Sequence, residues 1–187
     1  MSYFVIRPGE TEFDAQSRIA GRLSLPLTAQ GRLQVGQMIQ QLKGTDLDVI
    51  YTSGTEPALA TATALADALD TDVKVVEDLV NMDLGLWQGL LLDEIRTRQP
   101  RVFKQWHDSP DAVCPPQGET CEEAYARVAA ALRKPLRRGR SFAVVCPEPL
   151  ATIVSCVIRN CDHRSPGPMC GCAVTKRVEE IALPVPV

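Results

Sequence analysis

The sequence predicts an α/β protein, a three-layer α/β/α sandwich built around a mostly parallel central sheet. Short apolar runs of strand type alternate along the chain with stretches whose apolar residues recur at helical spacing. Such alternation is typical of parallel sheets that carry helices on both faces. With 187 residues, of which 45% are hydrophobic, the chain is large and apolar enough for one domain with a sizeable core.

The expected strands are short apolar runs that recur along the whole chain. They cover residues 3–6, 48–52, 73–76, 141–145 and 173–181. Ligands of parallel sheets bind beyond the carboxyl ends of the strands. The residues that directly follow these runs are therefore the first place to look for a functional site.

The expected helices lie between the strands and begin at recognisable signals. Thr28 is a candidate N-cap, because its hydroxyl can accept a hydrogen bond from the first turn. The apolar residues after it lie at positions i, i+3, i+4 and i+7, namely Val35, Met38, Ile39 and Leu42. Further helices are expected over Pro57–Leu69, directly after Glu119 and Thr120, and over 149–160.

The charge and the apolar pattern of the sequence argue against several classes of function. The net charge is −3 and the isoelectric point is about 5.4, which gives no general attraction to nucleic acid. No segment is apolar enough to span a membrane, and the N-terminus lacks the features of a signal peptide. We expect one cytoplasmic domain over residues 1–183 and an extended tail over 184–187, with no cofactor and no nucleic-acid or membrane partner.

A chain of short motifs carries a family resemblance. The segment Arg7-Pro8-Gly9-Glu10-Thr11 follows the first strand and resembles Arg-His-Gly-Glu-Thr, which opens the histidine phosphatase (phosphoglycerate mutase-like) superfamily. Other segments resemble family motifs in the same order, namely 18–21, 26–31, 50–53, 83–89, 116–120 and 144–147. The resemblance covers about residues 3–181. It implies the phosphoglycerate mutase-like sandwich, in which residues of about 80–120 form an insertion that shapes the substrate mouth.

The departures from the family pattern fall on the reacting groups. By the resemblance, the nucleophilic histidine position is Pro8, the second histidine is Pro147, a supporting arginine is Pro57 and the general-acid glutamate is Asn81. A histidine attacks phosphorus with a ring nitrogen, whereas a proline nitrogen is an amide without a free lone pair. An asparagine forms hydrogen bonds but donates no proton as a general acid near neutral pH.

The resemblance therefore implies a pseudophosphatase, a family member without a catalytic residue. Its role would be binding, either of a small anionic ligand in the old pocket or of a protein partner, including a second copy in a homodimer. The positions that would bind the anion are Arg7, Glu10, Thr11, Arg18, Gly21 and Ser53. The sequence leaves open whether Arg7 binds a ligand or instead pairs with Glu10 or another acidic residue.

Alternatives with catalytic activity also remain open from the sequence. Cys146 follows a strand and could serve as a replacement nucleophile, although a small residue at a strand end is the simpler interpretation. A soft-metal site could form from the C-terminal cluster Cys161, His163, Cys170 and Cys172. A residual phosphatase or phosphomutase would need His107 or His163, the only histidines of the chain, to enter the site.

Overall fold

A computed structural model describes residues 2–161 and 176–182, and its centre is a five-stranded sheet. The strands are β1 (Tyr3–Ile6), β2 (Val49–Thr52), β3 (Asp72–Val75), β4 (Phe142–Val145) and β5 (Val178–Ile181). They lie in the order β3-β2-β4-β1-β5, in which β1 to β4 are parallel and β5 is antiparallel to β1. The predicted α/β class with a mostly parallel sheet is confirmed.

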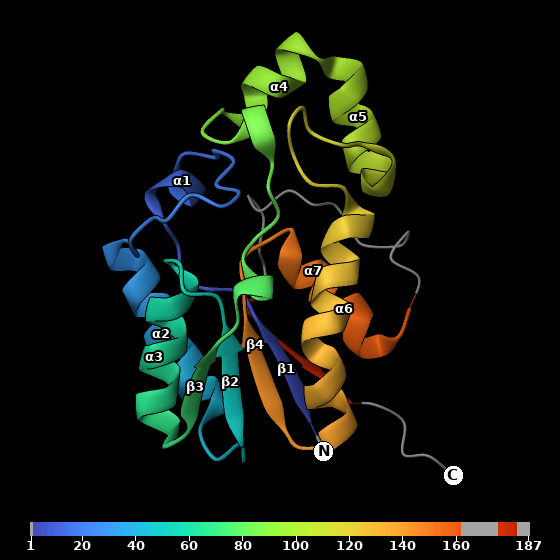
Figure 1. Ribbon diagram of the computed structural model, residues 1–187. Coiled ribbons are helices and arrows are strands. Elements are labelled where there is room, and N and C mark those ends of the chain that lie inside the picture. The colour runs from blue at the N-terminus through green and yellow to red at the C-terminus, as the bar shows by residue number, and fades with distance from the viewer. Residues whose placement is uncertain (1, 162–175, 183–187) are drawn as a thin grey trace.

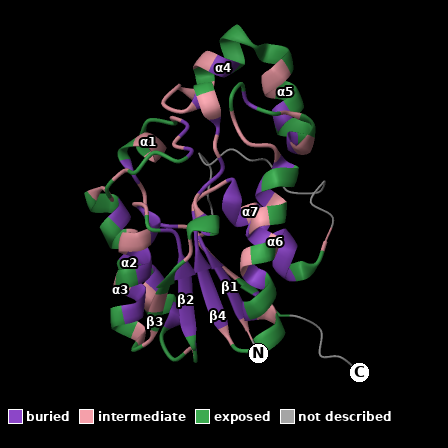
Figure 2. Cartoon of the chain, viewed as in Figure 1, coloured by how far each residue is buried: buried purple, intermediate pink, exposed green. Residues whose placement is uncertain are grey.

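Two pairs of helices cover the two faces of the sheet (Figure 1). They are α2 (Ala29–Leu42) and α3 (Ala58–Leu69) on one face, and α6 (Cys121–Arg138) and α7 (Leu150–Arg159) on the other. Alternate residues of each strand point to opposite faces, so Tyr3 and Val5 join the core under α6 and α7, while Phe4 and Ile6 join the core under α2 and α3. The inner strands β1, β2 and β4 are buried along their whole length, whereas the edge strands β3 and β5 are partly exposed (Figure 2).

Local capping fixes where these helices begin and end. The Thr28 hydroxyl accepts a hydrogen bond of 2.9 Å from the Gly31 amide, as the sequence predicts for the start of α2. Thr120 and Glu123 form a reciprocal capping box at the start of α6. That helix ends at Gly139, whose φ of 61° is a left-handed conformation that glycine adopts at low cost.

The segment beyond the carboxyl ends of the strands is more helical than the sequence predicts. It contains α4 (Leu92–Arg98) and α5 (Pro100–Asp108), and the short α1 (Glu12–Ala15) lies on the same side of the sheet (Figure 1). Apolar packing explains the difference, because Trp106 of α5 is buried against Trp87 at a ring distance of 5.2 Å. Two prolines of this segment, Pro100 and Pro110, begin helical turns, a position at which the missing N–H costs no hydrogen bond.

The last part of the chain is described only over residues 176–182. The strand expected over 173–181 appears there as Val178–Ile181, and residues 173–175 lie outside the described residues. The tail expected over 184–187 also lies outside them. No helix in the described part of the chain is long and apolar enough to cross a membrane.

Candidate functional site

A cavity opens where β1, β2 and β4 end, which is where a parallel sheet places its ligands. It encloses about 70 Å³, several times the ~15 Å³ that admits one water molecule. The four positions at which the sequence departs from the family pattern all line it, namely Pro8, Pro57, Asn81 and Pro147. Residues from distant parts of the chain therefore meet at one site, as the resemblance implies.

Prolines form much of the cavity wall. Pro8 follows β1, Pro57 precedes α3, and Pro147 and Pro149 lie between β4 and α7. None of these residues has a backbone N–H to offer to an anion. The side chain of Trp106, from α5, adds an apolar surface to the same wall.

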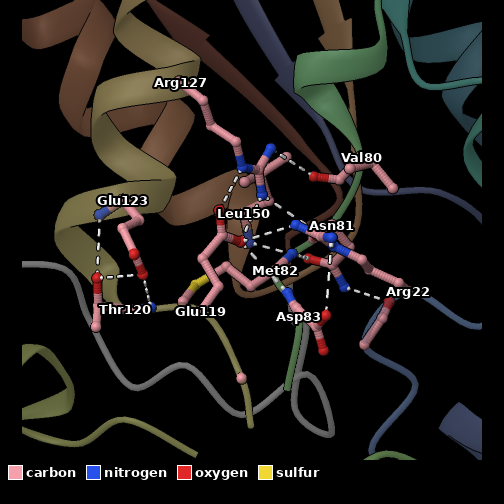
Figure 3. Close-up of polar contacts among 12 residues, drawn as sticks. Arg22, Val80, Asn81, Met82, Asp83, Glu119, Thr120, Glu123, Arg127 and Leu150 are labelled. Carbon is pink, nitrogen blue, oxygen red and sulfur yellow. Dashed lines mark hydrogen bonds and ion pairs between the residues drawn. The ribbon is translucent and has the colours of Figure 1, made fainter. Parts of the chain in front are cut away.

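Asn81 is a buried structural crosslink in this site. Its side-chain amide donates to the carbonyl oxygens of Gly21 at 2.9 Å and Glu148 at 3.0 Å. Its side-chain oxygen accepts from the amides of Met82 at 2.9 Å and Leu150 at 3.3 Å (Figure 3). Because both donor hydrogens and both acceptor positions are used, the side chain has no free capacity for a ligand.

Gly21 lies directly beside this crosslink and cannot be replaced without a steric conflict. Its φ is 53°, and a Cβ atom added there would lie 2.1 Å from the Gln88 side-chain oxygen. Gln88 in turn accepts a hydrogen bond of 2.7 Å from the Arg22 amide. The glycine of the sequence motif therefore permits the close approach of two loops, and it lines the cavity.

Arg127 and Glu119 form a second polar network beside Asn81 (Figure 3). The guanidinium of Arg127 contacts both carboxylate oxygens of Glu119, at 2.6 and 2.9 Å, and donates to the carbonyl oxygens of Val80 and Asn81. Arg22 donates to the same Asn81 carbonyl and to Glu119. Sequence reasoning missed both arginines, since the Pro-Gln-Gly-Glu-Thr motif points only to Glu119.

Arg7 is neutralised by carboxylates inside the protein. Its Nε donates to Glu148 at 2.6 Å and its terminal nitrogen donates to Glu179 at 3.3 Å. Burial alone lowers the pKa of Arg7, but the two carboxylates outweigh burial and leave the pKa raised. Of the two possibilities left open by the sequence, the structure has Arg7 paired with acidic residues, and Glu10 is not one of them.

Glu148 holds Arg7 and the start of α7 together. Its second carboxylate oxygen accepts from the Thr152 amide at 3.1 Å and from the Thr152 hydroxyl at 2.8 Å. The side chain is only 8% exposed. No motif of the sequence pointed to Glu148, because its role depends on the approach of β1 and α7 in the folded chain.

The remaining expected ligand positions divide into two groups. Arg18 and Thr11 line the cavity with Arg7 and Gly21. Arg18 donates to the Gly89 carbonyl at 2.8 Å, and the Thr11 hydroxyl donates to Asp14 at 2.7 Å. Each of these polar groups already has a partner within the chain.

Glu10 and Ser53 do not line the cavity. The Glu10 carboxylate accepts a hydrogen bond of 2.9 Å from the Thr28 hydroxyl, which ties the first loop to the start of α2. Ser53 is 1% exposed, and its hydroxyl lies 3.1 Å from the Thr55 hydroxyl. Both residues support neighbouring loops.

The charged side chains that line the cavity balance one another. The cationic ones are Arg7, Arg18 and Arg177, and the anionic ones are Asp14, Glu56 and Glu148. Arg177 donates to the Pro8 carbonyl, a contact that the sequence did not indicate. A site for a phosphate dianion needs an excess of positive charge or of N–H donors, and the charged side chains that line this cavity among the described residues give no excess of positive charge.

The geometry argues against Cys146 as a nucleophile. Its side chain is completely buried in the core beneath α6 and α7 and does not line the cavity. Burial raises the pKa of the thiol far above its usual range, so the reactive thiolate does not form. The residue behaves as a small apolar group at the end of β4, which was the simpler interpretation of the sequence.

The proposed metal ligands are only partly within the described residues. Cys161 is described, whereas His163, Cys170 and Cys172 lie outside the described residues. Within residues 2–161 and 176–182, no group of three His, Cys, Asp or Glu side chains could hold a metal ion. His107 lies on α5 with an exposed ring, 3.1 Å from Asp108, and does not line the cavity.

Comparisons with known proteins agree with this architecture. The chain is 30% identical over 141 residues to phosphoserine phosphatase 1 of Hydrogenobacter thermophilus, covering 75% of this chain and 67% of that protein. It is 32% identical over 151 residues to the bifunctional protein Rv2228c of Mycobacterium tuberculosis, covering 80% of this chain but only 39% of that protein. The solved structure of YhfR from Bacillus stearothermophilus is 26% identical and superposes with a TM-score of 0.81, covering 98% of this chain and 91% of that one.

The model of the histidine phosphatase superfamily (branch 1) matches residues 3–166 of this chain. That span includes the four parallel strands and the cavity at their carboxyl ends, except for Arg177. The predicted family and the predicted sandwich are therefore both confirmed. The chain belongs to the histidine phosphatase superfamily.

Proposed function

We propose that this chain is a catalytically inactive histidine phosphatase, which acts by binding rather than by turnover. The observation that carries the proposal is that Pro8, Pro57, Asn81 and Pro147 line one cavity in place of the reacting groups of the family. The fold and the surrounding motifs are kept while the groups that would react with a phosphate ester are replaced. Retention of the scaffold without the chemistry favours a binding role.

The rest of the site cannot replace the nucleophile and the cationic groups that the family uses for phosphoryl transfer. Phosphoryl transfer depends on a nucleophile and on positive charge that stabilises the transferred group. Loss of a single stabilising donor typically costs about 10²–10³ in kcat. Here the nucleophile position is Pro8, and two further positions that would be cationic are Pro57 and Pro147.

An enzyme that uses replaced chemistry is the weaker interpretation. The only candidate nucleophile from the sequence near the site, Cys146, is buried outside the cavity. Substitution Cys146→Ser tests this interpretation, since loss of a hydrolytic activity on that change would support it. We expect no such activity in either protein.

The cavity favours a small ligand that carries no net negative charge over the anionic ligand suggested by the sequence. The charged side chains that line it among the described residues balance, and Arg7, which follows the first strand, is already paired with two carboxylates. The proline-rich wall and Trp106 offer an apolar surface to the body of such a ligand. A protein partner, including a second copy of the chain, is the other mode of binding, and the cytoplasm is the proposed compartment.

Two measurements on the purified chain test the proposal. Incubation with a ³²P-labelled phosphomonoester, followed by denaturation at alkaline pH, at which a phosphohistidine is stable, would trap that intermediate in an active family member, and we expect no label on this chain. A thermal-shift screen should include phosphate, phosphorylated metabolites and their uncharged or zwitterionic counterparts, because a ligand of the folded state raises Tm. Covalent labelling would refute the proposal, whereas a saturable shift by an unphosphorylated compound would support it and name the ligand class.

A further inference from the structure

We propose that Glu148 is an internal ligand, whose carboxylate occupies the anion subsite of the cavity and excludes phosphate from it. The carboxylate has the donors that an oxyanion would use. One oxygen accepts from the Arg7 guanidinium at 2.6 Å, and the other accepts from the amide and hydroxyl of Thr152 at 3.1 and 2.8 Å. A guanidinium, a helix-terminal N–H and a hydroxyl together make a typical oxyanion cradle.

The cradle is built into the fold and does not depend on mobile surface groups. Arg7 directly follows β1, and its amide donates to the Arg177 carbonyl at 2.8 Å. Thr152 lies in the first turn of α7, a helix of 10 residues whose N-cap, Pro149, makes no side-chain capping bond. Glu148 therefore satisfies an N–H group of α7 that no cap residue serves, and its negative charge suits the positive end of the helix dipole.

The burial of Glu148 and Arg7 strengthens the ion pair by which Glu148 occupies the anion subsite. The side chain of Glu148 is 8% exposed and that of Arg7 is 14% exposed, so water screens their attraction only weakly. Glu179 of β5 adds a second carboxylate to the same guanidinium. A phosphate that approached Arg7 would meet two fixed negative charges and would have to displace one of them.

The consequence is that the cavity excludes phosphate, a selectivity that the prolines alone do not give. Prolines remove reacting groups but leave Arg7 in place, and an unpaired Arg7 would still attract phosphate. With Glu148 present, the cavity selects against phosphate monoesters and admits ligands without that group. This inference builds on the proposed binding role of the cavity, and it assigns the larger part of the phosphate exclusion to Glu148, which contacts Arg7 at 2.6 Å against 3.3 Å for Glu179.

The experiment is a calorimetric titration of inorganic phosphate into the full chain and its variants. We expect the native chain to show no saturable binding below about 10 mM phosphate, and Glu148→Ala to bind at least about tenfold more tightly. The double variant Arg7→Ala with Glu148→Ala should lose the gain. Glu180→Gln is the matched charge control, because this exposed carboxylate accepts only from the Ser2 hydroxyl among the described contacts, and it should behave like the native chain.

A second variant keeps the test decisive if Glu148→Ala does not fold. Glu148→Gln keeps the volume of the side chain and removes its charge, and it should bind phosphate at least about threefold more tightly than the native chain. The inference is overturned if the native chain binds phosphate tightly, or if folded Glu148 variants bind it no better than the native chain does. Phosphate turnover by the native chain would instead refute the proposed function, so the two failures are distinguishable.

Discussion

Replacement of Asn81 by alanine tests the structural role that we assign to this position. The substitution removes four hydrogen bonds, to the backbone groups of Gly21, Met82, Glu148 and Leu150. Asn81 is 3% exposed, so those backbone groups would lose their partners away from bulk water. At a net value of about 1 kcal/mol for each bond, we expect the free energy of unfolding to fall by about 4 kcal/mol.

The assay is urea denaturation of the native chain and of the Asn81→Ala variant. The readout is the shift of the transition midpoint, which reports a change in the free energy of unfolding when the m-value is unchanged. Gln30→Ala is the matched control, because Gln30 is an exposed amide on α2 with no side-chain hydrogen bond among the described contacts. It should change the free energy of unfolding by less than about 0.5 kcal/mol. A loss below about 1 kcal/mol in Asn81→Ala would refute the reasoning that this asparagine holds the cavity loops together.

Further predictions concern the chemistry and the pH dependence of the chain. Pro8→His alone should release no phosphate from a phosphomonoester above background, because the other replaced positions still lack their roles; clear rescue would contradict this. Alkylation of the folded chain, read by mass spectrometry, should modify the exposed Cys114 and spare the buried Cys146, and equal labelling would show that the β4 end opens to solvent. Burial alone would raise the pKa of Glu179, but hydrogen bonds from Ser155 and Arg159 and the charge of Arg7 outweigh burial and lower this pKa in the folded chain. The ionised carboxylate therefore stabilises the fold fully above its unfolded pKa near 4.5, and this stabilisation is lost as pH falls through the folded pKa. Glu179→Gln should therefore flatten the fall in unfolding free energy at acid pH, and an unchanged slope in denaturation series would speak against it.

Much of the scaffold could be predicted because its signals are local. Short apolar runs predict β1 to β4, helical spacing and start signals predict α2, α3, α6 and α7, and Thr28 and Thr120 mark where two of these helices begin. The order of the motifs also predicts that Pro8, Asn81 and Pro147 meet at one site. Each of these inferences depends only on residues that are close in sequence or on a pattern that the whole family shares.

The contacts that give the site its charge could not be predicted, because they join residues far apart in the chain. Glu148 lies 141 positions from Arg7, and no spacing rule relates the two. Arg127 likewise reaches back to Val80 and Asn81 from the middle of α6. Helix α5 was missed for a related reason, since its stability depends on the packing of Trp106 rather than on a long periodic pattern.

The most direct test of the account is the steady-state release of phosphate by the native chain. The purified chain would be assayed against a broad panel of phosphomonoesters, with an active histidine phosphatase as positive control. The Arg7→Ala variant would be assayed in parallel, because a true activity of this cavity should fall with loss of its arginine whereas a contaminant's should not. We expect no release above background in either protein. Turnover by the native chain that persists through purification and is lost in Arg7→Ala would contradict it.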